Sequence, residues 1–325
     1  MNFSLKAAFA IVISTHITTV SLPGFAADAA RFPTKPIRLM VSASIGGTTD
    51  ALARMIGAKM NESWGQAVVV DNRPGAGGTL AASTVAKAAP DGHTLLLSNS
   101  FGLAAALQPN LPYDPLNDFA GVAEIGQGCA VLVVAPASGV KSIRELIALA
   151  KAQPGKLIFG SSGVGTLPQL QGARFNRGAG IKVITVAFKG NAEATIEVLA
   201  GRAHYSISPA VTALPFIKEG KLLALAVTRQ IPALPEVPSF AETLPEFKKS
   251  VTSYGLLAPG GTLRPILNQL SKEVARILDL PDIKERLQAI AFVPTPSTPE
   301  EYDKILREQI ESLSRLITDA GIRAK

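Results

Sequence analysis

The chain has 325 residues, a formal net charge of +7, 47% hydrophobic residues and 18% charged residues. This composition excludes an intrinsically disordered protein, and the length is sufficient for two ordinary domains. The basic residues form no cluster along the sequence, so we expect no nucleic-acid partner.

The first 26 residues have the pattern of a secretory signal peptide. Lys6 precedes a mostly apolar stretch at residues 7–22, and Gly24-Phe25-Ala26 provides the small residues that signal peptidase requires. Polar residues interrupt the apolar stretch, which disfavours the alternative of an uncleaved membrane anchor. Cleavage after Ala29 is a second option. We therefore expect a soluble, monomeric mature protein in the periplasm.

Residues 37–64 read as a buried strand, a glycine-rich turn and a helix. The turn contains Gly46-Gly47, and either Thr48 or Thr49 is predicted to cap the helix, with Asp50 in its first turn. The free backbone N–H groups at such a helix start suit a carboxylate. A plain strand–helix connection explains the same pattern when this stretch is taken alone.

The rest of the chain alternates between strand and helix patterns. We expect strands at 67–70, 94–97, 129–135, 157–159, 183–186, 203–207, 222–227 and 254–258. We expect helices at 79–88, between Ser142 and Pro154, after Thr166, at 192–200, after Thr262 and after Thr298. This alternation predicts an α/β fold with a mainly parallel sheet, whose ligands bind beyond the carboxyl ends of the strands.

The pattern suggests two α/β lobes with a ligand cleft between them. The apolar strand at 129–135 is predicted to cross to the second lobe, and the strand at 254–258 to return the chain to the first. The first lobe would comprise residues 27–126 and 250–325, and the second lobe residues 127–249.

Several motifs resemble catalytic or cofactor sites but are incomplete. Ser138 and Lys141 match the S-x-x-K pattern of penicillin-binding enzymes, yet no K-T-G follows. Residues 160–166 lack both the second glycine of a nucleophile elbow and the lysine of a P-loop, and Gly75 to Gly78 is interpreted as a turn. A hydrolase that uses Ser138 or Ser162 would need a general base, and the sequence offers none nearby. The three histidines and Cys129 stand at no metal-ligand spacing. We expect no catalytic residue, cofactor or metal.

Short motifs follow one another in a fixed order: PIRL at 36–39, GGTTD at 46–50, NRPGAGG at 72–78, APDGHTLLL at 89–97, LPYDPLNDF at 111–119, PGKL at 154–157, FKG at 188–190, LALAVT at 223–228, LPEVPSFAE at 234–242 and GLLAPGGT at 255–262. With these motifs, the chain resembles the extracytoplasmic solute receptors of tripartite tricarboxylate transporters, the Bug family. The resemblance covers nearly the whole mature chain.

This resemblance implies a type II periplasmic-binding-protein fold that closes on a small carboxylate, such as a dicarboxylate, a tricarboxylate or an aromatic acid. The ligand would pass to membrane permease subunits or, alternatively, be presented to a two-component sensor kinase. The implied ligand-binding residues are Ser44, Ile45, Gly46, Gly47, Thr48, Thr49, Asp50, Ser98, Asn99, Ser100, Gly163, Val164, Gly165, Thr166, Lys189 and Ser208. Among these, Asp50 is expected to hold its loop or helix start.

Three regions depart from the family pattern. The first loop has Ala43-Ser44-Ile45 in place of Phe-Pro-Pro, and Phe188 replaces a tyrosine. Ser208 stands where the family has an aspartate, and His204 replaces another acid. We hypothesise that loss of the acid at 208 disfavours ligands that carry an ammonium group.

Overall fold

The computed structural model describes residues 31–108, 110–245, 247 and 252–320. The predicted signal peptide at residues 1–26 lies outside this range. From Pro33 to Lys325 the chain forms one compact unit that contains two β-sheets. Within the described residues, we find no helix that is both long and apolar enough to cross a membrane.

The first sheet has six strands in the order β11-β4-β10-β3-β1-β2. Their bounds are β1 Ile37–Val41, β2 Val68–Asn72, β3 Thr94–Ser98, β4 Phe119–Gly128, β10 Thr252–Pro259 and β11 Val293–Pro294. β1 pairs in parallel with β2 and β3, whereas β10 runs antiparallel to both β3 and β4. β1 and β3 are almost continuously apolar because helices cover both faces of the sheet.

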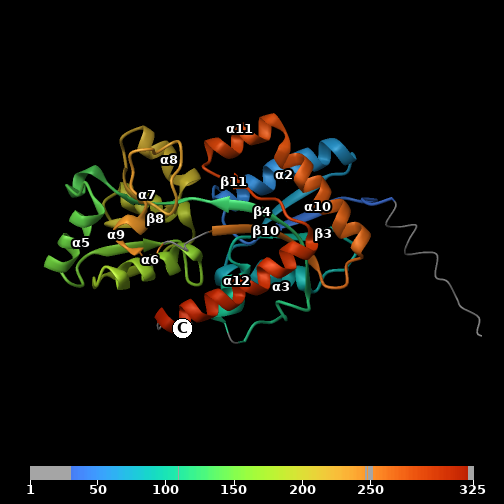
Figure 1. The fold of residues 1–325 in the computed structure, drawn as a ribbon, viewed down its shortest axis with the longest axis horizontal. Helices are drawn as coiled ribbons and strands as arrows, with labels where there is room; N and C mark the ends of the chain where they lie inside the picture. The colour runs from blue at the N-terminus through green and yellow to red at the C-terminus, as the bar shows by residue number, and fades with distance from the viewer. Residues whose placement is uncertain (1–30, 109, 246, 248–251, 321–325) are drawn as a thin grey trace, which may run out of the picture. The chain divides into compact units, whose positions relative to one another are not determined.

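Six helices belong to this first sheet: α2 Thr48–Trp64, α3 Thr79–Ala86, α4 Phe101–Leu107, α10 Arg264–Asp279, α11 Pro281–Ala289 and α12 Pro299–Ala320. α2 and α10 lie on one face, and α3 and α12 lie on the other (Figure 1). Met40 and Leu257 of the sheet pack against Val85 of α3 and Tyr302 of α12. We call this sheet with its helices lobe 1.

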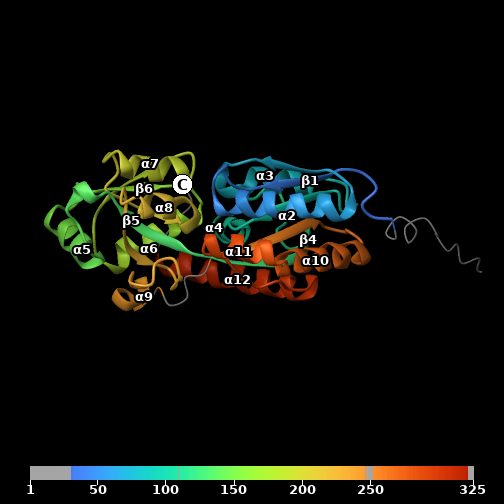
Figure 2. The ribbon, with the colours of Figure 1, turned by 90° about the horizontal axis from the view of Figure 1, so that it is seen from above.

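The second sheet has five strands in the order β7-β6-β8-β5-β9. Their bounds are β5 Ala130–Val134, β6 Ile158–Ser161, β7 Ile184–Ala187, β8 Tyr205–Pro209 and β9 Leu223–Val227. Its helices are α5 Ile143–Ala152, α6 Leu167–Gly178, α7 Asn191–Leu199, α8 Ala210–Lys218 and α9 Phe240–Thr243. We call this sheet with its helices lobe 2; it lies beside lobe 1 in both views (Figure 2).

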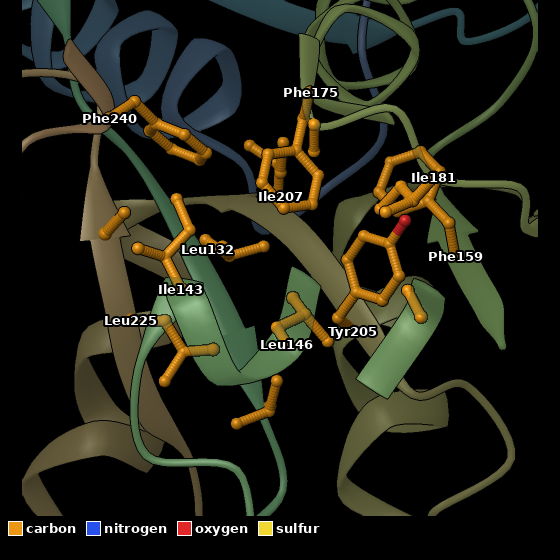
Figure 3. Close-up of a cluster of buried hydrophobic side chains, with 14 of the residues drawn as sticks. Leu132, Ile143, Leu146, Phe159, Phe175, Ile181, Tyr205, Ile207, Leu225 and Phe240 are labelled. Atoms are coloured by element: carbon orange, nitrogen blue, oxygen red, sulfur yellow. The ribbon is translucent and has the colours of Figure 1, made fainter. Parts of the chain in front are cut away.

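The core of lobe 2 joins one face of the sheet to α5, α6 and α9. Leu132 and Ile207 of the sheet point toward Ile143 and Phe175 of the helices (Figure 3). Tyr205 is fully buried, and burial raises the pKa of its phenol well above the usual value. This packed core fixes the positions of the strand ends and therefore of the loops that follow them.

The chain passes from lobe 1 to lobe 2 at the buried Cys129, between β4 and β5, and returns through β10. The predicted crossing strand at 129–135 therefore belongs to lobe 2, and the crossing point lies at its start. The elements β4, β11, α4, α8, α9 and α11 were not predicted from the sequence. The lobe boundaries at 126/127 and 249/250 stay a prediction, since residues 33–325 form one unit.

Candidate ligand-binding site

A cavity of about 860 Å³ lies where loops of the two lobes meet. Lobe 1 contributes residues that follow β1, β2 and β3, and lobe 2 contributes residues that follow β6, β7 and β8. The carboxyl ends of the parallel strands therefore face this cavity, as the sequence predicted for an α/β sheet.

Six of the described helices begin at the cavity: α2, α3, α4, α6, α7 and α8. The N-cap residues of α2, α3 and α7 are Gly47, Gly78 and Gly190, and all three line the cavity. Because glycine has no side chain, nothing at the N-cap satisfies the first N–H groups of these helices. α6 differs, since the Thr166 side chain caps it by accepting a hydrogen bond from the N–H of Gln169. The partial positive charges of these helix ends make the cavity attractive to an anion.

The start of α2 corrects one prediction. Thr48 is the first helical residue, so neither Thr48 nor Thr49 occupies the N-cap position, and the predicted threonine cap is wrong. Asp50 does lie in the first turn. Its Oδ2 accepts a hydrogen bond from the Gly46 N–H at 3.1 Å, and its Oδ1 accepts one from Arg54 Nε at 3.0 Å. Asp50 thus holds the 44–47 loop, the role expected from the family resemblance.

The protonation of Asp50 follows from these contacts. Burial opposes ionisation, since the residue is only 4% exposed. The hydrogen bonds from Arg54 and from the Gly46 N–H outweigh burial and hold the pKa of Asp50 below its usual value. Asp50 is therefore charged at neutral pH, but it does not line the cavity.

Tyr254 of β10 lines the cavity, although the sequence analysis did not single it out. Its hydroxyl lies near the side chains of Thr48 and Asn99, two other lining residues that lower its pKa. Burial raises the pKa of Tyr254 to about 12, so the phenol stays protonated. A tyrosine within an apolar strand pattern resembles an ordinary core residue, and the sequence carries no signal that distinguishes the two.

The two lobes touch on both sides of the cavity. On one side Gly77 lies against Gly165, and an added Cβ on Gly77 would stand 2.7 Å from the Gly165 carbonyl oxygen. On the other side Gly190 lies against Ser44, and Thr212 Oγ1 donates a hydrogen bond to the Gly46 carbonyl at 3.4 Å. The two lobes are therefore in direct contact beside the cavity.

Most of the predicted ligand-binding residues come together at the cavity. These are Ser44, Gly47, Thr48, Thr49, Asn99, Ser100, Gly163, Val164, Gly165, Thr166 and Lys189. Their contact with a ligand stays a prediction. Ile45, Gly46, Asp50, Ser98 and Ser208 do not line it.

These five residues lie elsewhere for identifiable reasons. Ile45 is 66% exposed on the outer side of its loop. Ser98 is buried and accepts hydrogen bonds from Ser42 Oγ at 2.8 Å and from the Ser100 N–H at 3.2 Å. Ser208 is also buried and hydrogen-bonded with Thr195 Oγ1 at 2.8 Å. Ser98 and Ser208 therefore support neighbouring side chains below the cavity surface.

The sequence analysis also missed part of the lining. The glycine-rich turn at 75–78, interpreted only as a turn, lines the cavity, and Gly75, Gly77 and Gly78 adopt positive φ angles that favour glycine. The NRPGAGG motif was the available signal. Leu103, Leu107 and Leu170 also line the cavity, but apolar helical positions look like ordinary core in a sequence.

The lining of the cavity carries little charge. Among the described residues that line it, Lys189 is the single charged side chain, and it is exposed. Glu193 of α7, which is not among the lining residues, accepts a hydrogen bond from the Lys189 N–H at 2.7 Å. The described residues contain no group of three side chains suited to hold a metal ion.

A family model described as the tripartite tricarboxylate transporter family receptor matches residues 52–322. The chain belongs to this family. The receptor is 36% identical over 318 residues to the UPF0065 protein in the tcbD-tcbE intergenic region of Pseudomonas sp. strain P51, covering 96% of this chain and 94% of that protein. It is 32% identical over 320 residues to protein BugT of Bordetella pertussis, covering 97% and 98%.

Two solved structures resemble the receptor closely. Rpa4515 of R. palustris with adipate has a TM-score of 0.85 and 31% identity, covering 90% of this chain and 99% of its own. MatC of Rhodopseudomonas palustris with bound malate has a TM-score of 0.82 and 32% identity, covering 88% and 100%. The predicted type II periplasmic-binding-protein fold is thereby confirmed. The family consists of periplasmic binding receptors, which confirms the prediction that this chain is not an enzyme.

Proposed function

We propose that this receptor captures a small carboxylate in the cavity between its lobes and delivers it, in the periplasm, to the membrane permease of a tripartite tricarboxylate transporter. The observation that carries this proposal is the convergence of six helix N-termini of the described residues on one cavity. Lys189 adds a positive charge, and no acidic side chain is among the described lining residues. Similar receptors bind adipate and malate, which supports a carboxylate ligand.

The expected interaction free energies are large enough for a protein that binds a carboxylate. A hydrogen bond to a charged group contributes about 1.5–3 kcal/mol. A partly buried helix N-terminus adds up to about 2 kcal/mol for an anion. Two such bonds at the starts of α2 and α7, together with the helix ends, therefore approach the roughly 8 kcal/mol that a micromolar dissociation constant requires.

A thermal-shift screen of the signal-cleaved protein tests the capture of a carboxylate. Each acid is paired with its neutral amide, for example benzoate with benzamide and succinate with succinamide. Ligand at about 100 times its dissociation constant adds roughly 2.7 kcal/mol to the free energy of unfolding. We expect stabilisation by at least one acid and none by its amide. Equal stabilisation by acid and amide, or no stabilisation by any acid, contradicts the proposal.

Two further measurements test location and delivery. N-terminal sequencing of the protein from a periplasmic fraction should begin at Ala27, or at Ala30 if cleavage follows Ala29. Immobilised receptor with saturating ligand should retain a permease subunit from solubilised membranes and release it when the ligand is withdrawn. Retention of a sensor-kinase ectodomain in place of the permease would overturn the delivery step.

A further inference from the structure

The edge strands of the two described sheets are β11, β2, β7 and β9, and three of them are protected from pairing with another polypeptide. β9 is covered by the chain that follows it, because the Val227 N–H donates to the Pro238 carbonyl at 2.9 Å. β11 has only two residues. β2 carries charges, since Asp71 is paired with Arg38 and Arg73. Short length, covering chain and charged side chains are the usual devices that protect a sheet edge.

β7 lacks both the covering chain and the charges. Its four residues are uncharged, and among the described strands it pairs with β6 alone. Ile184 is 50% exposed, and Thr185 and Ala187 are exposed as well. An exposed and uncharged edge strand of this kind is a template on which an extended segment of another chain can add.

The backbone groups on the outer side of β7 are available for such pairing. The N–H groups of Ile184 and Phe188 each donate to a carbonyl at one end of β6, at 2.8 Å. Successive backbone groups along a strand point to opposite sides, so the N–H and C=O groups of Thr185 and Ala187 point away from β6. No other described strand lies on that side of β7.

The cavity between the lobes extends to this edge. Thr185 and Ala187 line it together with Gln169, Leu170 and Ala173 of α6. A segment that adds to β7 would therefore lie in a groove beside α6, with apolar side chains of α6 along one of its faces.

The charges around β7 are positive. Lys182 and Lys189 stand at the two ends of the strand, and both are exposed. The Gly155 N–H donates to the Lys182 carbonyl at 2.7 Å, which brings Lys156 to the same end. Residues 156–190, which include β6, α6 and β7, contain no Asp or Glu. The acidic residue that follows, Glu193 of α7, accepts a hydrogen bond from the Lys189 N–H at 2.7 Å.

These charges select between two occupants of the edge. A second copy of the receptor, paired antiparallel through its own β7, would bring its Lys189 close to Lys182 of the first copy. Like charges that face each other across paired strands are destabilising. A segment with acidic residues at its ends would instead place a carboxylate beside each lysine.

From these observations we propose that β7 is a docking edge for an extended, acidic segment of another protein, which adds to the sheet of lobe 2 as a further strand. Its backbone pairs with Thr185 and Ala187, and its acidic side chains lie beside Lys182 and Lys189. At about 3.3 Å per residue the two lysines are roughly 23 Å apart along the chain, which a segment of about seven residues spans. An interface of this size is typical of weak, reversible association. The proposal does not depend on the identity of the small ligand.

The first test measures binding of a synthetic heptapeptide, Glu-Val-Thr-Val-Thr-Val-Glu, by fluorescence anisotropy at low salt. The peptide is labelled with fluorescein at its N-terminus and amidated at its C-terminus, so it has no terminal carboxylate. One control peptide has Lys at both ends, and the other carries N-methyl groups on its five internal residues, which removes their N–H donors. Both controls should bind at least about tenfold more weakly. No binding of the Glu-ended peptide, or equal binding of the Lys-ended peptide, would overturn the proposal.

Receptor variants locate the docking edge. Thr185→Pro removes an N–H that points away from β6, so it leaves the pairing with β6 intact and should weaken peptide binding at least about tenfold. Thr185→Val keeps the N–H and should bind the peptide as the unmodified receptor does. Lys182→Glu should weaken binding about three- to tenfold, and because Lys182 does not line the cavity, such a loss is not explained by entry of the peptide into the cavity.

Two results of these variants would contradict the proposal. One is unchanged peptide affinity in Lys182→Glu, which tests the edge even if Thr185→Pro fails to fold. The other is self-association of the receptor that Thr185→Pro abolishes, measured by analytical ultracentrifugation, because a second copy would then be the occupant of β7.

Discussion

Gly77→Ala tests whether contact between the lobes is needed for ligand capture. Gly77 has a φ of +65°, and its Cβ position faces the backbone of Gly165 in the other lobe. The added methyl carbon would stand 2.7 Å from the carbonyl oxygen and 3.2 Å from the carbonyl carbon of Gly165. Because these are backbone atoms, no side-chain rotation relieves the contact, and the two loops must separate.

The free-energy cost of Gly77→Ala has two parts, and a control variant separates them. A positive φ costs a non-glycine residue about 1–2 kcal/mol, and this part lowers the free energy of unfolding whether or not the lobes touch. Overpacking costs about 1–3 kcal/mol, and this part acts only while the two lobes are in contact. Ligand affinity should therefore fall by about 5- to 150-fold. Gly220→Ala provides the control, since Gly220 has a φ of +67° and nothing lies within 4 Å of its added Cβ.

The assay is calorimetric affinity for the best carboxylate of the thermal-shift screen, together with a fluorescence-transfer pair that has one label on each lobe. Gly165→Ala should fall between the other two variants, because its added Cβ would stand 3.3 Å from Gly77 Cα. Gly220→Ala should keep full affinity while losing stability. Unchanged affinity of Gly77→Ala, or an equal loss in Gly220→Ala, would refute the claim that this contact supports capture.

Three further predictions concern charge. Since the folded pKa of Asp50 lies below its ordinary value of 3.8, its stabilisation is complete above that value and is lost as the pH falls through the folded pKa. Asp50→Asn should lower the free energy of unfolding by about 1–3 kcal/mol at pH 7 and flatten its fall below pH 4, measured by urea unfolding; an unaltered pH profile would count against it. Lys189→Gln should weaken carboxylate binding no more than about fivefold and reduce its salt dependence, because the ammonium is exposed; a hundredfold loss would make Lys189 the main anchor instead. Aspartate and glutamate should bind weakly, since Ser208 replaces an acid and no described lining residue is acidic, and nanomolar affinity for either would reject this.

The starts of α5 and α12 were predictable because local side-chain caps mark them, whereas the cap predicted at α2 is wrong. At α12, the Thr298 N–H donates to Glu301 at 2.8 Å and the Glu301 N–H donates to Thr298 Oγ1 at 3.2 Å, so these two residues form a capping box where the helix was expected to begin. At α5, Ser142 accepts from the Glu145 N–H, and the Glu145 carboxylate accepts from the Lys141 N–H. Such contacts join residues a few positions apart, so a sequence window contains both partners.

β4 could not be predicted in the same way, because residues far away in the sequence pack against its glycines. Gly121, Gly126 and Gly128 interrupt the apolar pattern. A Cβ on Gly126 would meet the Val293 carbonyl and the Phe292 ring, and one on Gly128 would meet the Tyr254 ring. The strand is glycine-rich because elements more than a hundred residues away lie against its backbone. Within a window of the sequence, the same glycines favour a loop.

The candidate site was also predictable from the sequence only in part. Strand order predicted which loops face the cavity, because the carboxyl ends of parallel strands meet at one edge. It could not predict which side chains point inward. Ser42 lines the cavity, whereas its hydrogen-bond partner Ser98 lies beneath it. The leucines that line the cavity belong to α4 of lobe 1 and α6 of lobe 2 and share one hydrophobic cluster, and no local pattern in the sequence encodes that contact.

Tyr254 connects the site to the passage between the lobes. Its hydroxyl reaches Thr48 and Asn99 at the cavity, while its ring packs on Gly128, next to the crossing at Cys129. β10 carries Tyr254 and is itself the strand that returns the chain to lobe 1. A ligand that contacts Thr48 or Asn99 therefore acts on a side chain seated where the lobes are joined. The lining of the cavity and the connection between the lobes are, through this residue, parts of one packed unit.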